Sequence, residues 1–212
     1  MHVASIFILF FMMFMPMAFA QDDNAIQNAV YQKNSYSAVT KDPKLMQALD
    51  LMDGTTGEWA KMAILGDNLS GKPVKIMFKD LSKISPQYAT FDALGWKDND
   101  TLYIYINKKH SNAPPEALAT ILCHEAVHQD TSSSIEEETY CWGYEADVWI
   151  QMKKRNPALI NISSSEYPLV NRLNTLEKMF KNVNYTTKEI KQSVSTNPGY
   201  SDLPMYSPGF GK

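Results

Sequence analysis

Two adjacent stretches of helical periodicity, separated by a few polar residues, constrain this chain more than any other part of its sequence. The first, at residues 114–129, opens with two prolines and carries apolar side chains at the spacing of one helix face. The second, at residues 134–155, opens with Ser134 and Glu137, which fit a capping box, and ends before Pro157. Because the connection is so short, we expect two adjacent antiparallel helices, a helix hairpin.

The remaining patterns predict an α+β fold. Residues 43–52 and 56–65 have helical spacing and end at glycine-containing turns, and residues 164–183 and 186–194 predict further C-terminal helices. Apolar and polar residues alternate at 74–79 and 102–106, and residues 87–91 predict a short third strand. We therefore expect a small antiparallel or mixed sheet of about three strands beside the helix hairpin.

The two ends of the chain differ from its middle. Residues 3–20 carry no charge, and the small residues Ala18 and Ala20 fit a cleavage site, so residues 1–20 predict a signal peptide. The chain is then exported, periplasmic or secreted, and would be membrane-anchored if the segment is not cleaved. Residues 21–41 form a polar lead-in, in which a propeptide is left open. Residues 42–195 predict a single domain, and residues 196–212, with three Pro and three Gly, predict a flexible tail.

Charge limits the partners that the chain can have. The net charge is −3 and the pI is near 5.8, which argues against nucleic acid binding. Residues 116–147 hold eight acidic residues and no Lys or Arg, which suits a cation site. Residues 153–191 carry eight basic and three acidic residues, either as a solvated helix face or as a surface for anionic lipid or cell-wall polymer. We expect a monomer.

The first helix of the predicted hairpin carries an H-E-x-x-H motif, formed by His124, Glu125 and His128. On a helix the two histidines lie one turn apart, so both imidazoles can reach one metal ion. Glu125 lies on the same side, where its carboxylate can contact a water on that metal without being a ligand. The spacing predicts a zinc site formed by His124 and His128, with Glu125 as its catalytic base.

Two imidazoles need a third protein ligand to bind zinc tightly. If the hairpin turns near Thr131, antiparallel register brings Glu138 opposite His124, which makes Glu138 the first choice. Glu137 and Glu145 remain alternatives, because register across a short loop is uncertain by a residue or two. Glu136 points away from Glu138 around the second helix. The alternative interpretation of these acids is a solvated helix N-terminus, where Glu is favoured.

These residues resemble the zincin metallopeptidases of the gluzincin type, in which the third ligand is a Glu on the following helix. The resemblance covers residues 74–152, and Cys141 stands where many members have a small residue three positions after the ligand Glu, which favours Glu138. Only nine residues separate His128 from Glu138, which implies a minimal domain. The sequence contains no third-His or Met-turn pattern, so a metzincin is disfavoured.

The resemblance implies one Zn²⁺ ion and hydrolysis of a peptide bond with Glu125 as general base. It also implies a donor for the developing oxyanion. Residue type alone suggests His110, Tyr144 or Tyr167. Each of these residues could instead have a structural or surface role. The strand at 102–106 could bind an extended peptide by edge addition, with Tyr103 and Tyr105 lining a cleft or only covering a sheet face.

The chain has two cysteines, Cys123 and Cys141. Export would bring them into an oxidising compartment, and antiparallel register brings them near each other, so a disulfide between the hairpin helices is one expectation. Free buried thiols and metal ligation by Cys123 are the others.

The sequence as a whole predicts an exported zinc metallopeptidase that acts on a peptide or protein substrate. The main alternative is a non-catalytic exported binding or envelope protein with a structural metal or none. A third is metal-dependent hydrolysis of a non-peptide amide.

Overall fold

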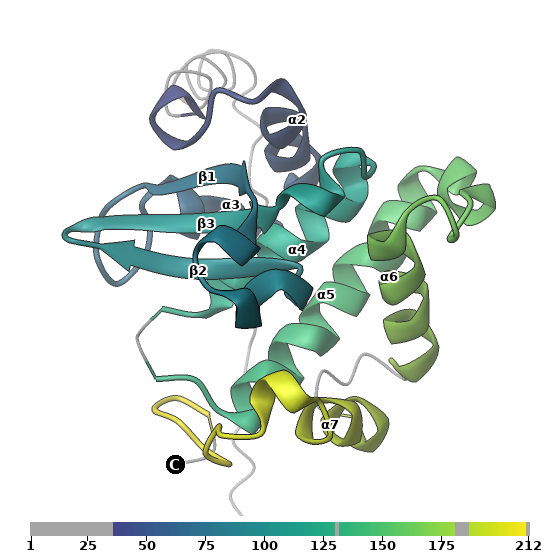
Figure 1. The fold of residues 1–212 in the computed structure, drawn as a ribbon. Helices are drawn as coiled ribbons and strands as arrows, with labels where there is room; N and C mark the ends of the chain where they lie inside the picture. Colours follow the sequence, from purple (N-terminus) through teal and green to yellow (C-terminus); the bar gives the residue numbers. More distant parts are fainter. Residues whose placement is uncertain (1–35, 130–131, 181–186, 211–212) are drawn as a thin grey trace, which may run out of the picture.

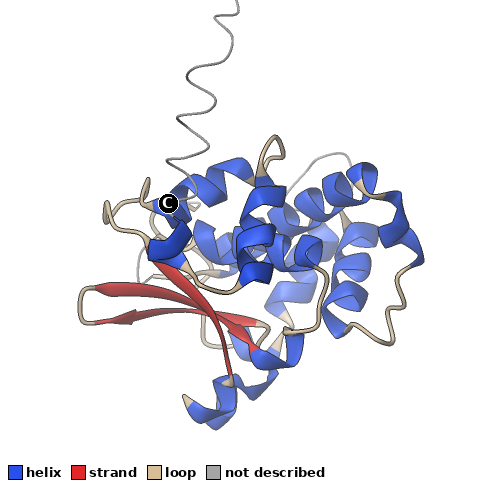
Figure 2. Ribbon diagram, turned by 90° about the horizontal axis from the view of Figure 1, so that it is seen from above, coloured by secondary structure: helices blue, strands red, loops and turns tan. Residues whose placement is uncertain are grey.

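The computed structural model describes residues 36–129, 132–180 and 187–210, so the predicted signal peptide and most of the lead-in lie outside the described residues. The fold is α+β, as predicted, with helices packed against a three-stranded mixed sheet. Figure 1 shows helices α4 (Pro115–Val127) and α5 (Ile135–Arg155) between the sheet and helix α6 (Pro168–Met179). Figure 2 shows that the strands lie to one side of the helices. Within the described residues, no helix is both long and apolar enough to span a bilayer.

The sheet has the strand order β1-β3-β2. Strand β1 (Val74–Lys79) runs parallel to the central strand β3 (Thr101–Asn107), and strand β2 (Ala93–Asp98) runs antiparallel to it, with Gly95 opposite Ile104. The prediction of a strand at residues 87–91 is wrong, because Pro86–Thr90 forms a 3-10 turn that begins with proline. Strand β2 lacks strict alternation of apolar and polar residues, and its pairing with β3 determines its conformation.

The predicted helix hairpin is present, and Ser134 caps α5 by accepting a hydrogen bond from the Glu137 amide at 3.2 Å. Helix α4 ends at Val127, two residues before the predicted end. His128 is the C-cap, with φ −70° and ψ 94°, and its backbone leaves the helical region. The side-chain amide of Gln129 donates a hydrogen bond to the Ala126 carbonyl at 2.6 Å, which satisfies one of the carbonyls left free at the helix end.

Shorter helices complete the described part of the chain. Helices α2 (Pro43–Met52) and α3 (Glu58–Leu65) precede the sheet, and Asp42 caps α2 as the sequence predicts. Helix α6 begins four residues later than predicted, because Pro168 disfavours the helical conformation of the residue before it. Helix α7 (Lys188–Ser195) is capped by Thr187, and residues 181–186 of the predicted helices lie outside the described residues.

Residues 196–210, for which the sequence predicts a flexible tail, contact the start of α5. The carbonyl of Pro204 accepts a hydrogen bond from the Ile135 amide at 2.9 Å, and that of Met205 accepts one from the Glu136 amide at 3.1 Å. These two amides have no partner within the helix, so the tail satisfies them. Ser207 is buried beneath the same turn.

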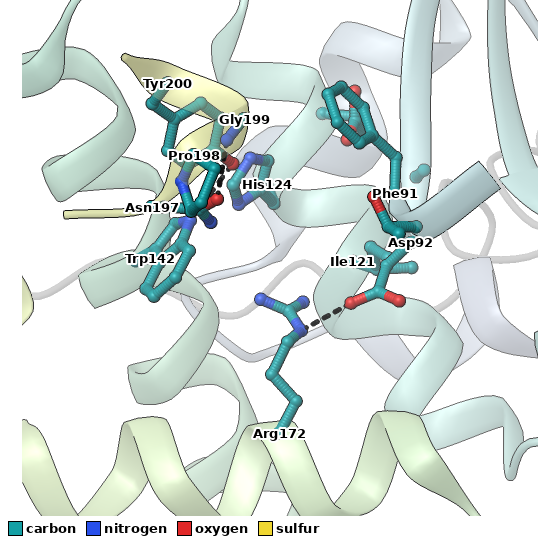
Figure 3. Close-up of a pocket in the computed structure, with 13 residues that line it drawn as sticks. Phe91, Asp92, Ile121, His124, Trp142, Arg172, Asn197, Pro198, Gly199 and Tyr200 are labelled. Carbon is teal, nitrogen blue, oxygen red and sulfur yellow. Dashed lines mark hydrogen bonds and ion pairs between the residues drawn. The ribbon is translucent and has the colours of Figure 1, made fainter. Parts of the chain in front are cut away.

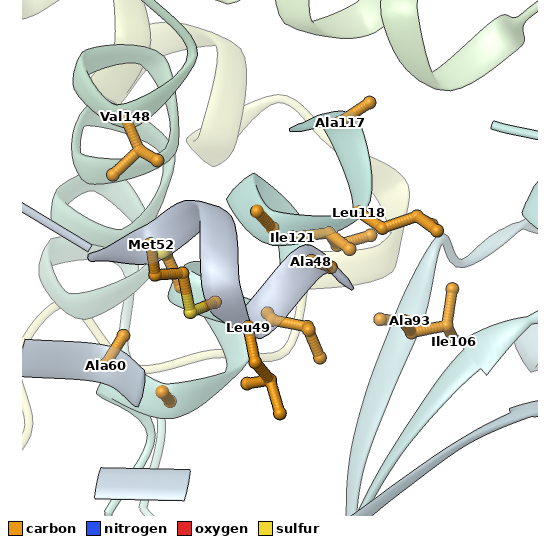
Figure 4. Close-up of a cluster of buried hydrophobic side chains, with 14 of the residues drawn as sticks. Ala48, Leu49, Met52, Ala60, Ala93, Ile106, Ala117, Leu118, Ile121 and Val148 are labelled. Carbon is orange, nitrogen blue, oxygen red and sulfur yellow. The ribbon is translucent and has the colours of Figure 1, made fainter. Parts of the chain in front are cut away.

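The hydrophobic core lies between α2, α4, α5 and the inner face of the sheet (Figure 4). Leu49 and Met52 from α2, Leu118 from α4 and Ile106 from β3 are fully buried in it. Helix α4 contributes almost all of its residues to this core, so its position is fixed by packing on several sides. The H-E-x-x-H motif is therefore held on a well-packed helix.

Candidate metal centre

The two histidines of the motif face each other at the end of α4. His124 lies in the last turn and is buried, and His128 lies at the C-cap with 18% of its side chain exposed. Their ring centroids are 5.4 Å apart. Both imidazoles are therefore directed to one region between α4 and α5.

Glu138 from α5 lies between the two histidines. Its Oε2 atom is 3.4 Å from His124 Nε2, and its Oε1 atom is 3.5 Å from His128 Nε2. These separations are long for hydrogen bonds. They match the distance of roughly 3.4 Å between two N or O ligands of a tetrahedral zinc ion. The buried atoms His124 Nδ1, Glu138 Oε2 and Glu145 Oε2 make no hydrogen bond within the described residues. Among these residues, the ligand atoms that lie close enough together to hold one ion belong to His124, His128 and Cys141, and Glu138 approaches each histidine with a different oxygen.

Glu137 and Glu145, the alternative ligands from the sequence analysis, lie beside the Nδ1 atoms of the two imidazoles. Glu137 Oε1 is 2.9 Å from His128 Nδ1, and Glu145 Oε2 is 3.5 Å from His124 Nδ1. Each histidine thus has its Nε2 atom directed to Glu138 and its Nδ1 atom directed to a second carboxylate. Carboxylates in this position orient metal-binding imidazoles and fix their tautomers.

Both outer carboxylates are held by side chains that the sequence analysis did not single out. Glu137 Oε2 accepts a hydrogen bond from the Ser207 hydroxyl at 2.9 Å. Glu145 Oε1 is paired with the guanidinium group of Arg172 from α6, and Arg172 Nε is 2.8 Å from Asp92 Oδ2. Ser207 and Arg172 are distant in sequence from the motif and belong to no motif of their own. Only the tertiary structure brings them to the site.

Cys123 and Cys141 are both buried free thiols, so the expected disulfide is not found. The Sγ atom of Cys123 packs beside Gly57, where a Cβ atom would lie only 2.8 Å from it. The Sγ atom of Cys141 is 3.8 Å from His128 Nε2 and can join the two histidines in holding an ion. Cys141, which the resemblance treats only as a small residue, therefore faces the site, whereas Cys123 packs elsewhere.

Glu125 lines two cavities that share His124 as a lining residue. The larger, with a volume of about 680 Å³, extends along β2 past Gly95, and the smaller, of about 500 Å³, lies beside Arg172. A Cβ atom on Gly95 would lie 3.5 Å from Glu125 Oε2, in ordinary van der Waals contact, so β2 passes directly beside this carboxylate. Burial raises the pKa of Glu125, which favours proton uptake by its carboxylate.

The smaller cavity is lined on one side by the C-terminal segment (Figure 3). Tyr200 from this segment lines both cavities, and its hydroxyl accepts a hydrogen bond from Trp142 Nε1 at 3.4 Å. In contrast, none of the three residues suggested as oxyanion donors lines either cavity. His110 pairs with Asp92, Tyr144 donates to the Thr56 carbonyl, and Tyr167 lies before α6. Tyr200 was missed because its segment has the composition of a loose tail.

The charges of the metal-free site reinforce one another. Burial alone would lower the pKa of His124, but the carboxylates of Glu138 and Glu145 outweigh it and raise that pKa to about 10. Burial alone would raise the pKa of Glu138, but contacts with His124, His128 and Tyr200 lower it to about 2. The His124 imidazolium and the Glu138 carboxylate therefore form a charged pair between α4 and α5.

The strand at residues 102–106 is not a free edge, which corrects the expectation that it pairs with an extended peptide. It belongs to β3, which is paired on both sides, and β2 is the edge strand that lines the larger cavity. Tyr103 also lines that cavity. Tyr105 is buried under Lys79, whose Nζ atom is 4.0 Å from the ring centroid, so this ring covers the sheet face.

No protein-family model, curated protein or solved structure matches this chain.

Proposed function

We propose that the chain is an exported zinc metallopeptidase of the gluzincin type. The observation that carries this proposal is the position of Glu138, whose two oxygens lie 3.4 and 3.5 Å from the Nε2 atoms of His124 and His128. His124, His128 and Glu138 would hold the ion, and the bound zinc would polarise a scissile carbonyl and acidify a water molecule. The uncharged, apolar residues 3–20 support export.

The residues of the chain supply the remaining steps of the reaction. Glu125 takes the proton of the attacking water and returns it to the leaving amine, and its burial suits it to hold that proton. Strand β2 binds the substrate backbone along the larger cavity, since its outer edge is unpaired within the sheet. The Tyr200 hydroxyl is the donor best located for the developing oxyanion, because it borders both cavities.

The proposal is tested with Glu125→Gln in a zinc-loaded chain. We expect this variant to keep its zinc and to lose peptide hydrolysis by about 100-fold or more, measured by mass spectrometry on a mixed peptide library. Glu116→Gln is the matched control, because Glu116 lies on the same helix but binds Asn156 at 2.8 Å, away from the site. Equal hydrolysis by wild type and Glu125→Gln would contradict the proposal.

A second candidate, a non-catalytic protein with a structural metal, is favoured by the position of Cys141. A site with four protein ligands is typical of structural zinc, and the Cys141 Sγ atom lies 3.8 Å from His128 Nε2. Such a protein would bind zinc and melt at a lower temperature after treatment with EDTA. Unlike the peptidase, it would hydrolyse no peptide with or without Glu125.

A further inference from the structure

Cys141 lies one turn after Glu138 on the same side of α5, and its thiol faces the candidate metal centre. One ring nitrogen of His124, one of His128 and the Cys141 Sγ atom all lie within 4.8 Å of one another. A nitrogen and a sulfur bound to one tetrahedral zinc ion would be roughly 3.6 Å apart. The observed distance from His128 Nε2 to Cys141 Sγ is 3.8 Å.

We propose that Cys141 is a fourth protein ligand and that its thiolate closes the metal site in the resting state. The proposal rests on the function proposed above. His124, His128, Glu138 and Cys141 together would complete a tetrahedral shell. As a ligand, Cys141 would bind as its thiolate and would give its thiol proton to solvent. For a substrate to reach the metal, Cys141 would leave the ion and take a proton back as the free thiol.

The other cysteine shows that burial alone does not bring a thiol to the site. Cys123 and Cys141 are both fully buried, and both lie on the hairpin helices. Cys123 precedes His124 in sequence, yet its Sγ atom packs against the turn at Gly57. Cys123 is therefore a packing residue and provides a control with the same chemistry and burial.

The consequence is a centre that exchanges between a closed form with four protein ligands and an open form with three. Thiolate is a strong zinc ligand, so the closed form binds the ion more tightly than the two imidazoles and Glu138 alone. Loss of the Cys141 thiol would weaken metal binding and free the fourth position for substrate. Metal affinity and hydrolysis would then change in opposite directions.

The test uses cobalt as a spectroscopic substitute for zinc in the full chain. We expect wild type loaded with one Co²⁺ ion to show a near-ultraviolet band from thiolate to cobalt charge transfer. Cys123→Ala should keep the band, which assigns it to Cys141 because the chain has two cysteines. Cys141→Ala should lose the band, bind zinc about tenfold or more weakly and hydrolyse peptides faster than wild type.

Two results would overturn the inference. If wild type binds one cobalt ion without a thiolate band, Cys141 is not a ligand, although the proposed function stands. If wild type binds no cobalt, both the inference and the proposed function fail. The wild-type and Cys123→Ala spectra show whether Cys141 binds the metal even if Cys141→Ala does not fold.

Discussion

The two histidines of the candidate site are four residues apart on one helix, yet the protein holds them in different ways. His124 is buried within α4, and its outer carboxylate, Glu145, has no exposed surface. Glu145 is paired with the cationic side chain of Arg172, which also pairs with Asp92. The His124 branch, defined as these four residues, is thus held by the buried Glu145 and the partly buried Arg172 and Asp92, which come from three separate parts of the chain.

The carboxylate beside His128 is held by buried hydroxyl groups rather than by a cation. His128 lies at the C-cap of α4, and its outer carboxylate, Glu137, accepts a hydrogen bond from Ser207 in the C-terminal segment. The Ser207 hydroxyl also lies 2.9 Å from that of Ser134, which caps α5. The His128 branch, defined as these four residues, therefore depends on hydrogen bonds between the start of α5 and the tail.

The comparison indicates in which branch a substitution should lower the free energy of unfolding more. A buried carboxylate that loses its cation leaves an uncompensated charge, whereas a carboxylate that loses one hydroxyl partner loses one hydrogen bond. We expect the His124 branch to dominate stability and the His128 branch to make a smaller contribution.

The largest effect is expected when Arg172 is replaced by Met, which removes the guanidinium group paired with the buried Glu145 carboxylate and leaves His124 as its remaining cationic neighbour. The free energy of unfolding should fall by about 3–5 kcal/mol, measured by urea denaturation. Arg172→Lys keeps the charge and should lower the free energy of unfolding by less than Arg172→Met. A loss below about 1 kcal/mol in Arg172→Met would show that the cluster of charges does not hold the branch.

The second effect concerns the pH dependence of thermal stability, which should reverse when metal is bound. In the folded chain without metal, the pKa of His124 is raised from 6.5 to about 10. Protonated His124 therefore stabilises the fold fully below pH 6.5. This stabilisation is lost as the pH rises toward 10. The melting temperature after EDTA treatment should therefore fall over this range. With zinc bound the imidazole must be neutral, so the stabilisation by zinc should grow as the pH rises.

Glu138→Gln is the control for this pH dependence, because it removes the carboxylate between the two histidines. The fall in melting temperature of the metal-free variant should be shallower than that of the metal-free wild type. Parallel curves for the two proteins would contradict the electrostatic account of His124.

The smallest effect is expected for Ser207→Ala, which removes the hydroxyl that binds Glu137. The free energy of unfolding should fall by about 1–2 kcal/mol, since the buried hydrogen bonds of this hydroxyl with Glu137 and Ser134 are lost. Ser201→Ala, at an exposed position of the same segment, should change it by less than about 0.5 kcal/mol. If Ser207→Ala lowered the free energy of unfolding as much as Arg172→Met does, the expected order of the two branches would be contradicted.

The local parts of the site could be predicted from the sequence. Helical spacing and the capping residue Ser134 predicted the hairpin, and its register brought Glu138 opposite His124. These features depend on residues close together in the chain, where periodicity and capping are informative.

The supporting residues could not be predicted, because they come from distant segments. Arg172 lies on a helix that looks like an ordinary amphipathic helix with a basic surface. Tyr200 and Ser207 lie in a segment rich in Pro and Gly, which resembles a flexible tail until its carbonyls bind the free amides of α5. Strand β2 was missed for the same reason, since its pairing with β3 rather than its own composition makes it a strand.

The most direct test of the account is the zinc content of wild type, Glu138→Ala and Glu136→Ala after dialysis against a weak chelator. Glu136 is the matched control, because it lies two residues before Glu138 in the sequence but pairs with Lys191, away from the histidines. We expect about one zinc ion per chain in wild type and in Glu136→Ala, and close to none in Glu138→Ala. Equal zinc in all three proteins, or none in wild type, would contradict the claim that His124, His128 and Glu138 bind one ion.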